Sequence, residues 1–193
     1  TMSSTPTKTD SSTFIPREIN TPNKEQPGIS KTVFSHISNL HSFVNDWNKI
    51  RDKGFRLCRA ISALKLHECT DDYYPQQLKP LTESLLEALE SLGNINDGIK
   101  AISTQLEALA KLQPTDQPVI LTWSVTQISD SVKEMCQFVE KEFRLKQVVI
   151  ENVAHCRDEK LIEVYVSAWE LDPYFKVESF VYLFAEVGLA GVA

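Results

Sequence analysis

Apolar residues recur every three or four positions along three long segments of the chain, which is the spacing of one face of an α-helix. The most regular repeat lies in residues 78–112, where spacings of four and three alternate throughout. Its members are Leu81, Leu85, Ala88, Leu92, Ile95, Ile99, Ile102, Leu106 and Leu109. Such a heptad pattern favours left-handed pairing with another helix. We therefore predict a long helix over 78–112 that packs against a neighbour along its whole length.

A second stripe runs through residues 32–70 and contains a glycine. Its members are Val33, Ile37, Leu40, Val44, Trp47, Ile50, Gly54, Cys58, Ile61 and Leu64. Glycine costs roughly 1 kcal/mol relative to alanine inside a helix. Gly54 therefore indicates a kink, a close approach by another backbone, or a tolerated residue, and the spacing alone does not choose among them.

The third long helical segment is predicted over 122–156, and within it the helix begins after Trp123. Ser124 and Gln127 have the spacing of a capping box, in which each side chain satisfies the other residue's backbone N–H. An imperfect heptad follows, and it stops near His155. Its members are Val125, Ile128, Val132, Met135, Val139, Leu145, Val149 and Val153.

Two short helices complete the pattern over residues 158–188. Asp158 is a candidate N-cap for the first, Asp172 followed by Pro173 is a candidate cap and first-turn pair for the second, and Gly188 is expected to end it. The sequence thus predicts an all-α fold. It consists of three long helices in an elongated antiparallel bundle or coiled coil, with a short C-terminal helical hairpin.

Residues 1–31 differ from this bundle, which we place at 32–193. They are rich in Ser, Thr and Pro and lack an apolar pattern, so we expect a disordered tail. Thr5 and Thr21 each begin a Thr-Pro-x-Lys sequence, which proline-directed cyclin-dependent kinases prefer. Both are candidate phosphorylation sites, with chance occurrence in a Thr- and Pro-rich segment as the alternative.

Composition and charge narrow the function. The chain has 193 residues, 42% of them hydrophobic, and a net charge of −6, which argues against a large nucleic-acid-binding surface. The four cysteines form no C-x-x-C pair and are expected to be reduced. No apolar run approaches the roughly 20 residues that span a bilayer, so no membrane association is expected.

Neither an active site nor a metal site is evident. No glycine frames a nucleophile, no phosphate-binding loop occurs, and the acidic residues are expected on solvent-facing surfaces. His155 and Cys156 are adjacent and would point about 100° apart on a helix, while a zinc site would need two further ligands. We therefore expect no catalytic residue, no cofactor and no metal. The tryptophans and tyrosines suit either a core or a protein interface.

Residues 141–175, KEFRLKQVVIENVAHCRDEKLIEVYVSAWELDPYF, carry a more specific pattern. They resemble the C-terminal signature of the cyclin-dependent kinase 2-interacting protein family. The matching positions are Lys141, Glu142, Leu145, Lys146, Val149, Ala154, His155, Asp158, Leu161, Tyr165, Ser167, Trp169, Pro173 and Tyr174. The first helix matches at Trp47, Asp52, Gly54, Phe55, Ile61, Leu64 and Lys65, and Trp123 and the Glu186–Gly188 ending also correspond.

The resemblance implies a non-enzymatic nuclear adaptor, with a cytoplasmic pool left open. Its implied partners are cyclin-dependent kinase 2, replication-origin and checkpoint proteins, and a pair of AAA+ ATPases with their co-subunit. That ATPase complex is tied to genome maintenance and to maturation of the large ribosomal subunit. The resemblance also favours close packing at Gly54 and Phe55, and an interface around Trp169 and Tyr174. The alternative is a structural coiled coil that self-associates without a specific partner.

Overall fold

The computed structural model describes residues 27–67, 76–114, 116–175 and 177–189. They form five helices: α1 (Pro27–His67), α2 (Leu78–Leu112), α3 (Val125–Val153), α4 (Glu159–Leu171) and α5 (Val177–Glu186). In these residues the only β-type pairing is an isolated bridge between Ile120 and Trp123. The predicted all-α class is confirmed, and α2 has the predicted bounds.

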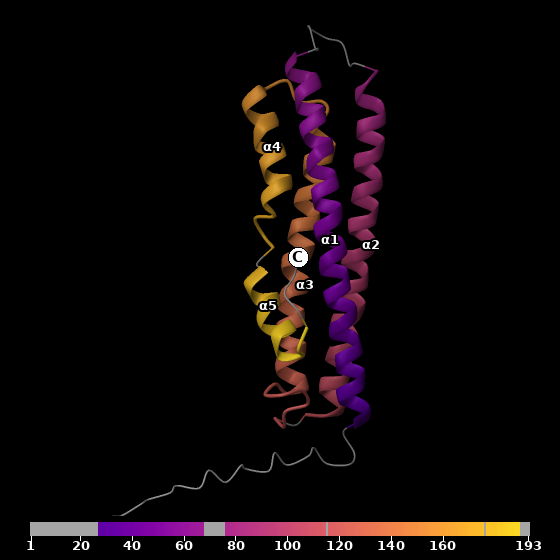
Figure 1. Cartoon of the computed structure of the whole chain (residues 1–193), viewed down its shortest axis with the longest axis vertical. Coiled ribbons are helices and arrows are strands. Elements are labelled where there is room, and N and C mark those ends of the chain that lie inside the picture. The colour runs from indigo at the N-terminus through magenta and orange to yellow at the C-terminus, as the bar shows by residue number, and fades with distance from the viewer. Residues whose placement is uncertain (1–26, 68–75, 115, 176, 190–193) are drawn as a thin grey trace, which may run out of the picture.

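The helices lie along one long axis in four columns (Figure 1). α1 and α3 run in one direction, and α2 and α4 run in the other. α1 packs on α2, α2 packs on α3, and α4 contacts both α1 and α3. The fourth column is divided, because α5 follows α4 along the side of α3.

The prediction that the last two helices form a C-terminal hairpin is wrong. α4 and α5 run one after the other in the same direction, rather than folding back on each other (Figure 1). The helix is interrupted at Asp172, which has a left-handed backbone with φ 44°, and at Pro173, which lacks the N–H that a continuing helix needs. The chain then resumes its course along α3.

The core is made from the apolar stripes that the spacing predicted. In α1 it contains Val33, Ile37, Leu40, Val44, Trp47, Cys58 and Ile61, and in α2 it contains Leu85, Leu92, Ile95, Ile99, Ile102 and Leu106. Leu81 and Leu109, at the two ends of the α2 stripe, are only partly buried. Full burial of one such aliphatic side chain contributes about 1.5–3 kcal/mol, so the stripes hold the columns together.

α1 begins at Pro27 rather than near residue 32, so residues 27–31 are helical and do not belong to the predicted tail; the rest of that predicted tail lies outside the described residues. Proline suits the first turn of a helix because its missing N–H would have no partner there. Ser30 Oγ donates a hydrogen bond to the carbonyl of Val119 at 2.8 Å, and Ile29 packs against the core. These contacts, which apolar spacing does not reveal, attach the first turn of α1 to the bundle.

The predicted helix boundaries at Ser124, Asp158 and Gly188 are confirmed. Ser124 and Gln127 form both hydrogen bonds of a capping box, and Asp158 accepts from the first backbone N–H groups of α4. Gly188, two residues after the end of α5, has φ +73°, a conformation that glycine adopts without a Cβ penalty. α3 itself, at 125–153, is shorter than the predicted 122–156.

Candidate functional site

Lys146 of α3 is completely buried, with 0% of its surface exposed. Its Nζ lies 3.0 Å from Glu142 Oε1 and 2.5 Å from Asp172 Oδ1. It also donates a hydrogen bond of 2.5 Å to the carbonyl oxygen of Trp169. A buried ammonium group is tolerated only when it is paired and hydrogen-bonded, and these three contacts meet that condition.

Asp172 is the second charged group of this cluster. Trp47 Nε1 donates to Asp172 Oδ2 at 3.1 Å, and Arg51 Nη1 lies 3.5 Å from the same oxygen. Its left-handed backbone, which Asp adopts more readily than most residues, ends α4. The prediction that Asp172 caps the second short helix is wrong, because α5 begins only at Val177 and the carboxylate is turned inward.

Glu142 is the third charged group. It is fully buried, and its Oε2 accepts a hydrogen bond of 2.8 Å from the backbone N–H of Tyr174. Burial raises the pKa of the Glu142 carboxyl, and the Lys146 ammonium opposes that rise. The expectation that acidic residues face solvent is therefore wrong for Glu142 and Asp172. Their charges are balanced by Lys146 and Arg51.

Trp169 packs directly over Gly54. A Cβ added to Gly54 would overlap Trp169 Cζ2, well inside van der Waals contact. The indole is held in place because its Nε1 donates to the carbonyl of Arg51 at 2.9 Å, and Lys146 Nζ lies 5.2 Å from the ring centre. The close-packing interpretation of Gly54 is confirmed, with a side chain rather than a backbone as its neighbour.

We call this group the Lys146 cluster: Trp47, Arg51, Gly54, Glu142, Lys146, Trp169 and Asp172. It joins α1, α3, the end of α4 and the turn that follows. Five of its members were candidates from the sequence, and the structure brings all five together. Because their partners lie within the chain, these side chains stabilise the fold and are not available to a binding partner.

Sequence reasoning missed the burial of Glu142 and Lys146, although a signal was present. Leu145 was taken as the seam residue between Val139 and Val149. The structure leaves Leu145 only partly buried and fills the buried positions with Glu142 and Lys146. Their spacing from the flanking valines is three, four and three, so they continue the stripe as two charged residues of opposite sign.

Trp123 lies elsewhere, at the end of the bundle where α5 finishes. Its backbone N–H donates to Glu186 Oε1 at 3.1 Å. The Thr122 hydroxyl donates to the same oxygen at 2.7 Å, and the Thr122 backbone N–H is a further donor. Glu186 thus joins the end of α5 to the turn before α3, which gives the Glu-x-Gly ending a structural role.

The remaining candidates are dispersed over the surface. Phe55 is partly buried, with the Arg59 guanidinium 5.4 Å from its ring centre, and Tyr165 packs against the core. Lys141, His155, Asp158, Pro173 and Tyr174 are exposed. Thr5 and Thr21 lie outside the described residues.

The described part of the chain contains no group of three or more His, Cys, Asp or Glu residues placed to hold a metal ion. Cys58, beside Lys146, is fully buried. Burial raises the pKa of its thiol to about 12, an effect that Lys146 partly opposes. A buried thiol that stays protonated is a poor nucleophile. No helix among the described residues is long and apolar enough to cross a membrane.

The outer face of α4 carries a feature that the sequence reasoning did not single out. Leu161, Val164, Ala168 and Leu171 are spaced by three, four and three, and we call them the α4 ridge. Val164 is 58% exposed and Leu171 is 71% exposed. A shallow groove of about 420 Å³ runs along this face, lined by Glu163, Val164, Ser167, Ala168, Leu171 and Pro173. The α4 ridge is offset from the buried stripe of Ile162, Val166 and Trp169. A second apolar stripe on one short helix was therefore the feature of the sequence that could have predicted an exposed apolar face.

No family model matches the chain. Comparison with characterised proteins finds cyclin-dependent kinase 2-interacting proteins from several vertebrates. The bovine protein is 22% identical over 191 residues, which cover 84% of this chain and 90% of that protein. The mouse protein is 23% identical over 189 residues, covering 83% and 89%, and the Xenopus laevis protein is 23% identical over 175 residues, covering 78% and 84%. The chain is a distant relative of the cyclin-dependent kinase 2-interacting proteins.

This relationship confirms the resemblance that residues 141–175 indicated. The similarity to the cyclin-dependent kinase 2-interacting proteins covers most of both chains, so it extends across the bundle rather than over a single motif. The relatives' names describe proteins that interact with cyclin-dependent kinase 2. In this chain the resembling residues divide between the interior and the surface: Glu142, Lys146 and Trp169 are buried in the Lys146 cluster, whereas others, such as Lys141, His155 and Tyr174, are exposed.

Proposed function

We propose that the protein is a non-enzymatic adaptor that binds other proteins, among them cyclin-dependent kinase 2. The observation that carries the proposal is the similarity to cyclin-dependent kinase 2-interacting proteins over more than four-fifths of the chain. The α4 ridge supports it, because contiguous exposed apolar surface commonly marks a protein-binding site.

The wider assembly is part of the same proposal and is supported by the family resemblance. It comprises two AAA+ ATPases with their co-subunit, together with replication-origin and checkpoint proteins. In this assembly the protein contributes to genome maintenance and to maturation of the large ribosomal subunit, and it acts in the nucleus. Phosphorylation of Thr5 and Thr21 by a proline-directed kinase would add negative charge to the segment that precedes α1 in the sequence.

Direct binding tests the proposal most simply. Purified cyclin-dependent kinase 2 is titrated into the full-length chain and the heat of binding is measured, with an unrelated kinase as the control. Saturable binding to cyclin-dependent kinase 2 alone is expected. If the heats for the two kinases are equal, the protein is not a specific kinase partner.

Affinity purification of the tagged chain from nuclear extract tests the wider assembly. Mass spectrometry at matched salt should recover two AAA+ ATPases in near-stoichiometric amounts. Their absence from a preparation that does contain cyclin-dependent kinase 2 would separate the two parts of the proposal.

A self-associating structural coiled coil is the alternative, and the regular heptad pattern of α2 originally favoured it. In the structure that pattern is used internally, since Leu85, Leu92, Ile99 and Leu106 are completely buried. Light scattering distinguishes the two functions. The adaptor should not assemble into large homo-oligomers on its own, whereas the structural protein should.

A further inference from the structure

Exposed apolar side chains concentrate on the fourth column of the bundle. In the described part of the chain eleven large apolar side chains are exposed, and six of them lie between residues 161 and 182. They are Leu161, Val164, Leu171, Tyr174, Val181 and Tyr182. The much longer helices α1 and α3 expose one each, Phe34 and Val148. The outer side of α4 and α5 therefore differs from the rest of the surface.

The spacing of the α4 ridge suits a helical partner. Leu161, Val164, Ala168 and Leu171 have the same three–four spacing that pairs helices inside the bundle, but Leu161, Val164 and Leu171 remain exposed. A partner helix with apolar residues at the same spacing could place its side chains between those of the α4 ridge and into the groove beside it.

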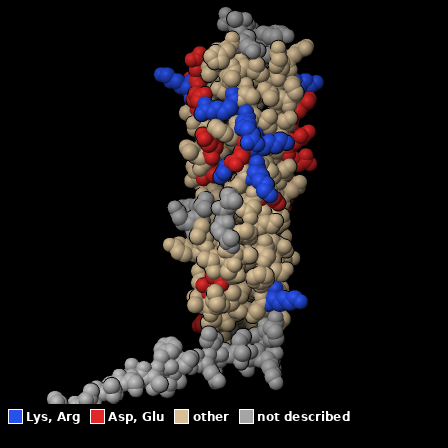
Figure 2. Space-filling view, viewed as in Figure 1, with Lys and Arg blue, Asp and Glu red and all other residues tan. Residues whose placement is uncertain are grey.

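Basic residues of α1 border this face. Residues 51–59 contain four basic residues, Arg51, Lys53, Arg56 and Arg59, and one acidic residue, Asp52. The chain as a whole carries a net charge of −6, so this segment is unlike its surroundings. Figure 2 shows these basic side chains, with acidic side chains among them, in the half of the molecule that contains α4, while the other half of this face carries few charges.

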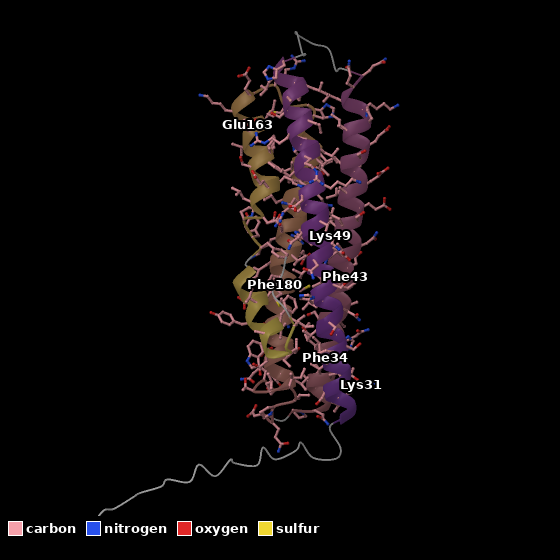
Figure 3. The ribbon with its side chains drawn as sticks, in the orientation of Figure 1. Lys31, Phe34, Phe43, Lys49, Glu163 and Phe180 are labelled. Carbon is pink, nitrogen blue, oxygen red and sulfur yellow. The ribbon has the colours of Figure 1, made fainter. Side chains whose placement is uncertain are left out.

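Two of these basic residues fix the segment to α4. Arg59 pairs with Glu163 at 2.9 Å, and Arg51 reaches Asp172. Figure 3 places Glu163 on α4 next to α1. Arg56 lies one helical turn before Arg59, and both are exposed, so a helix lying on the α4 ridge would have Arg56 and Arg59 along the flank that faces α1.

We propose that the α4 ridge and its groove bind an amphipathic helix of a partner protein, with apolar residues against the ridge and acidic residues facing the basic segment of α1. This proposal deepens the proposed function and rests on it, since it names the surface and the chemistry of the partner. The apolar contacts supply affinity, and the charge pairing orients the helix and speeds its association.

Two synthetic helical peptides of about 20 residues test the proposal. Both carry leucines at three–four spacing, and they differ only in their flanking charges, which are Glu in one and Lys in the other. Binding to the full-length chain is measured by fluorescence anisotropy. The Glu peptide should bind at least about tenfold more tightly than the Lys peptide, and raised salt should reduce the difference.

Variants of the full-length chain locate the site. Val164→Glu combined with Leu171→Glu should weaken the Glu peptide by about tenfold or more. Leu86→Glu is the matched control, because Leu86 is a comparably exposed leucine on α2, at 53%, and this variant should bind normally. Arg56→Glu should lower the preference for the Glu peptide. Thermal unfolding confirms that each variant is folded.

Several results would overturn the proposal. They are failure of the Glu peptide to bind at about 1 mM, equal binding of both peptides, and normal binding by the Val164/Leu171 variant. A fourth is a wild-type dimer that this variant dissociates, which would show that a second copy covers the α4 ridge. None of these requires cyclin-dependent kinase 2, so normal binding of that kinase to the wild-type chain would leave the proposed function standing.

Discussion

The two faces of α4 use apolar residues in different ways. The inner face places Trp169 over Gly54 and ends in the Lys146 cluster, where every charge has an opposite partner. The outer face leaves more than half of the surface of Val164 and of Leu171 exposed, at 58% and 71%. Within one helix of 13 residues, the inner face joins the columns of the bundle, and the outer face is the proposed site of association.

This difference explains what the distant similarity can report. Residues of the family signature such as Glu142, Lys146 and Trp169 lie on the inner side, where a substitution would leave a charge unpaired or a cavity. At these three positions the resemblance therefore concerns the fold. Leu161, Pro173 and Tyr174 also belong to the resembling residues, and they are exposed.

Removal of the central cation should have the largest effect on the inner side. Lys146→Met nearly preserves the side-chain volume but leaves Glu142 and Asp172 buried without their ammonium partner. We expect the free energy of unfolding to fall by about 3–5 kcal/mol, measured by urea denaturation. Lys141→Met, on the exposed surface of the same helix, is the control and should change it by less than about 0.5 kcal/mol. If Lys146→Met changes the free energy of unfolding by a similarly small amount, the Lys146 cluster does not stabilise the fold.

Gly54→Ala should have the next largest effect. Its Cβ would overlap the Trp169 ring, which is held by its hydrogen bond to Arg51. Overpacking of this kind costs about 1–3 kcal/mol, although alanine regains part of that through its higher helix propensity. Gly28→Ala is the control, because a Cβ there meets nothing within 4 Å. If Gly54→Ala is as stable as Gly28→Ala, the packing of Trp169 over Gly54 does not contribute to the free energy of unfolding.

The pH dependence of stability tests whether water is excluded from the Cys58 thiol on the inner side of the bundle. Its pKa rises from 9.0 to about 12 on folding, so between these values the folded chain binds more protons than the unfolded chain. The free energy of unfolding should therefore fall as the pH rises above 9, by on the order of 1 kcal/mol near pH 10. Cys58→Ala should show a shallower fall in urea denaturation at pH 8 and pH 10. Parallel curves for the two proteins would place Cys58 in contact with water.

Substitution on the outer face should have the smallest effect on stability. Leu171→Ser changes a side chain that is already 71% exposed, so the free energy of unfolding should change by less than about 0.5 kcal/mol. A loss above about 2 kcal/mol in the same urea assay would mean that Leu171 belongs to the core, and the contrast between the two faces would disappear.

The sequence predicted the elements whose signal is apolar spacing or cap chemistry. The stripes of α1 and α2, the capping box at Ser124 and the cap at Asp158 all depend on neighbours within one helix. Their pattern is local, and the structure follows it.

The errors arose where distant segments meet. The start of α1 depends on Ser30 reaching Val119, and the course of the chain after α4 depends on Asp172 turning inward to Trp47 and Lys146. Neither contact leaves a periodic signal. Glu142 and Lys146 did lie in register with the buried stripe, and a pair of opposite charges on such a stripe is the feature to look for in related chains.

The most direct test of the division between the two faces is a binding measurement on a folded outer-face variant. Wild-type chain and the Val164→Glu, Leu171→Glu variant are used to recover cyclin-dependent kinase 2 from nuclear extract, with thermal unfolding measured in parallel. The account predicts that the variant unfolds at the wild-type temperature and that the amount of kinase it recovers is lower by at least about tenfold. Equal recovery by the two proteins would contradict it.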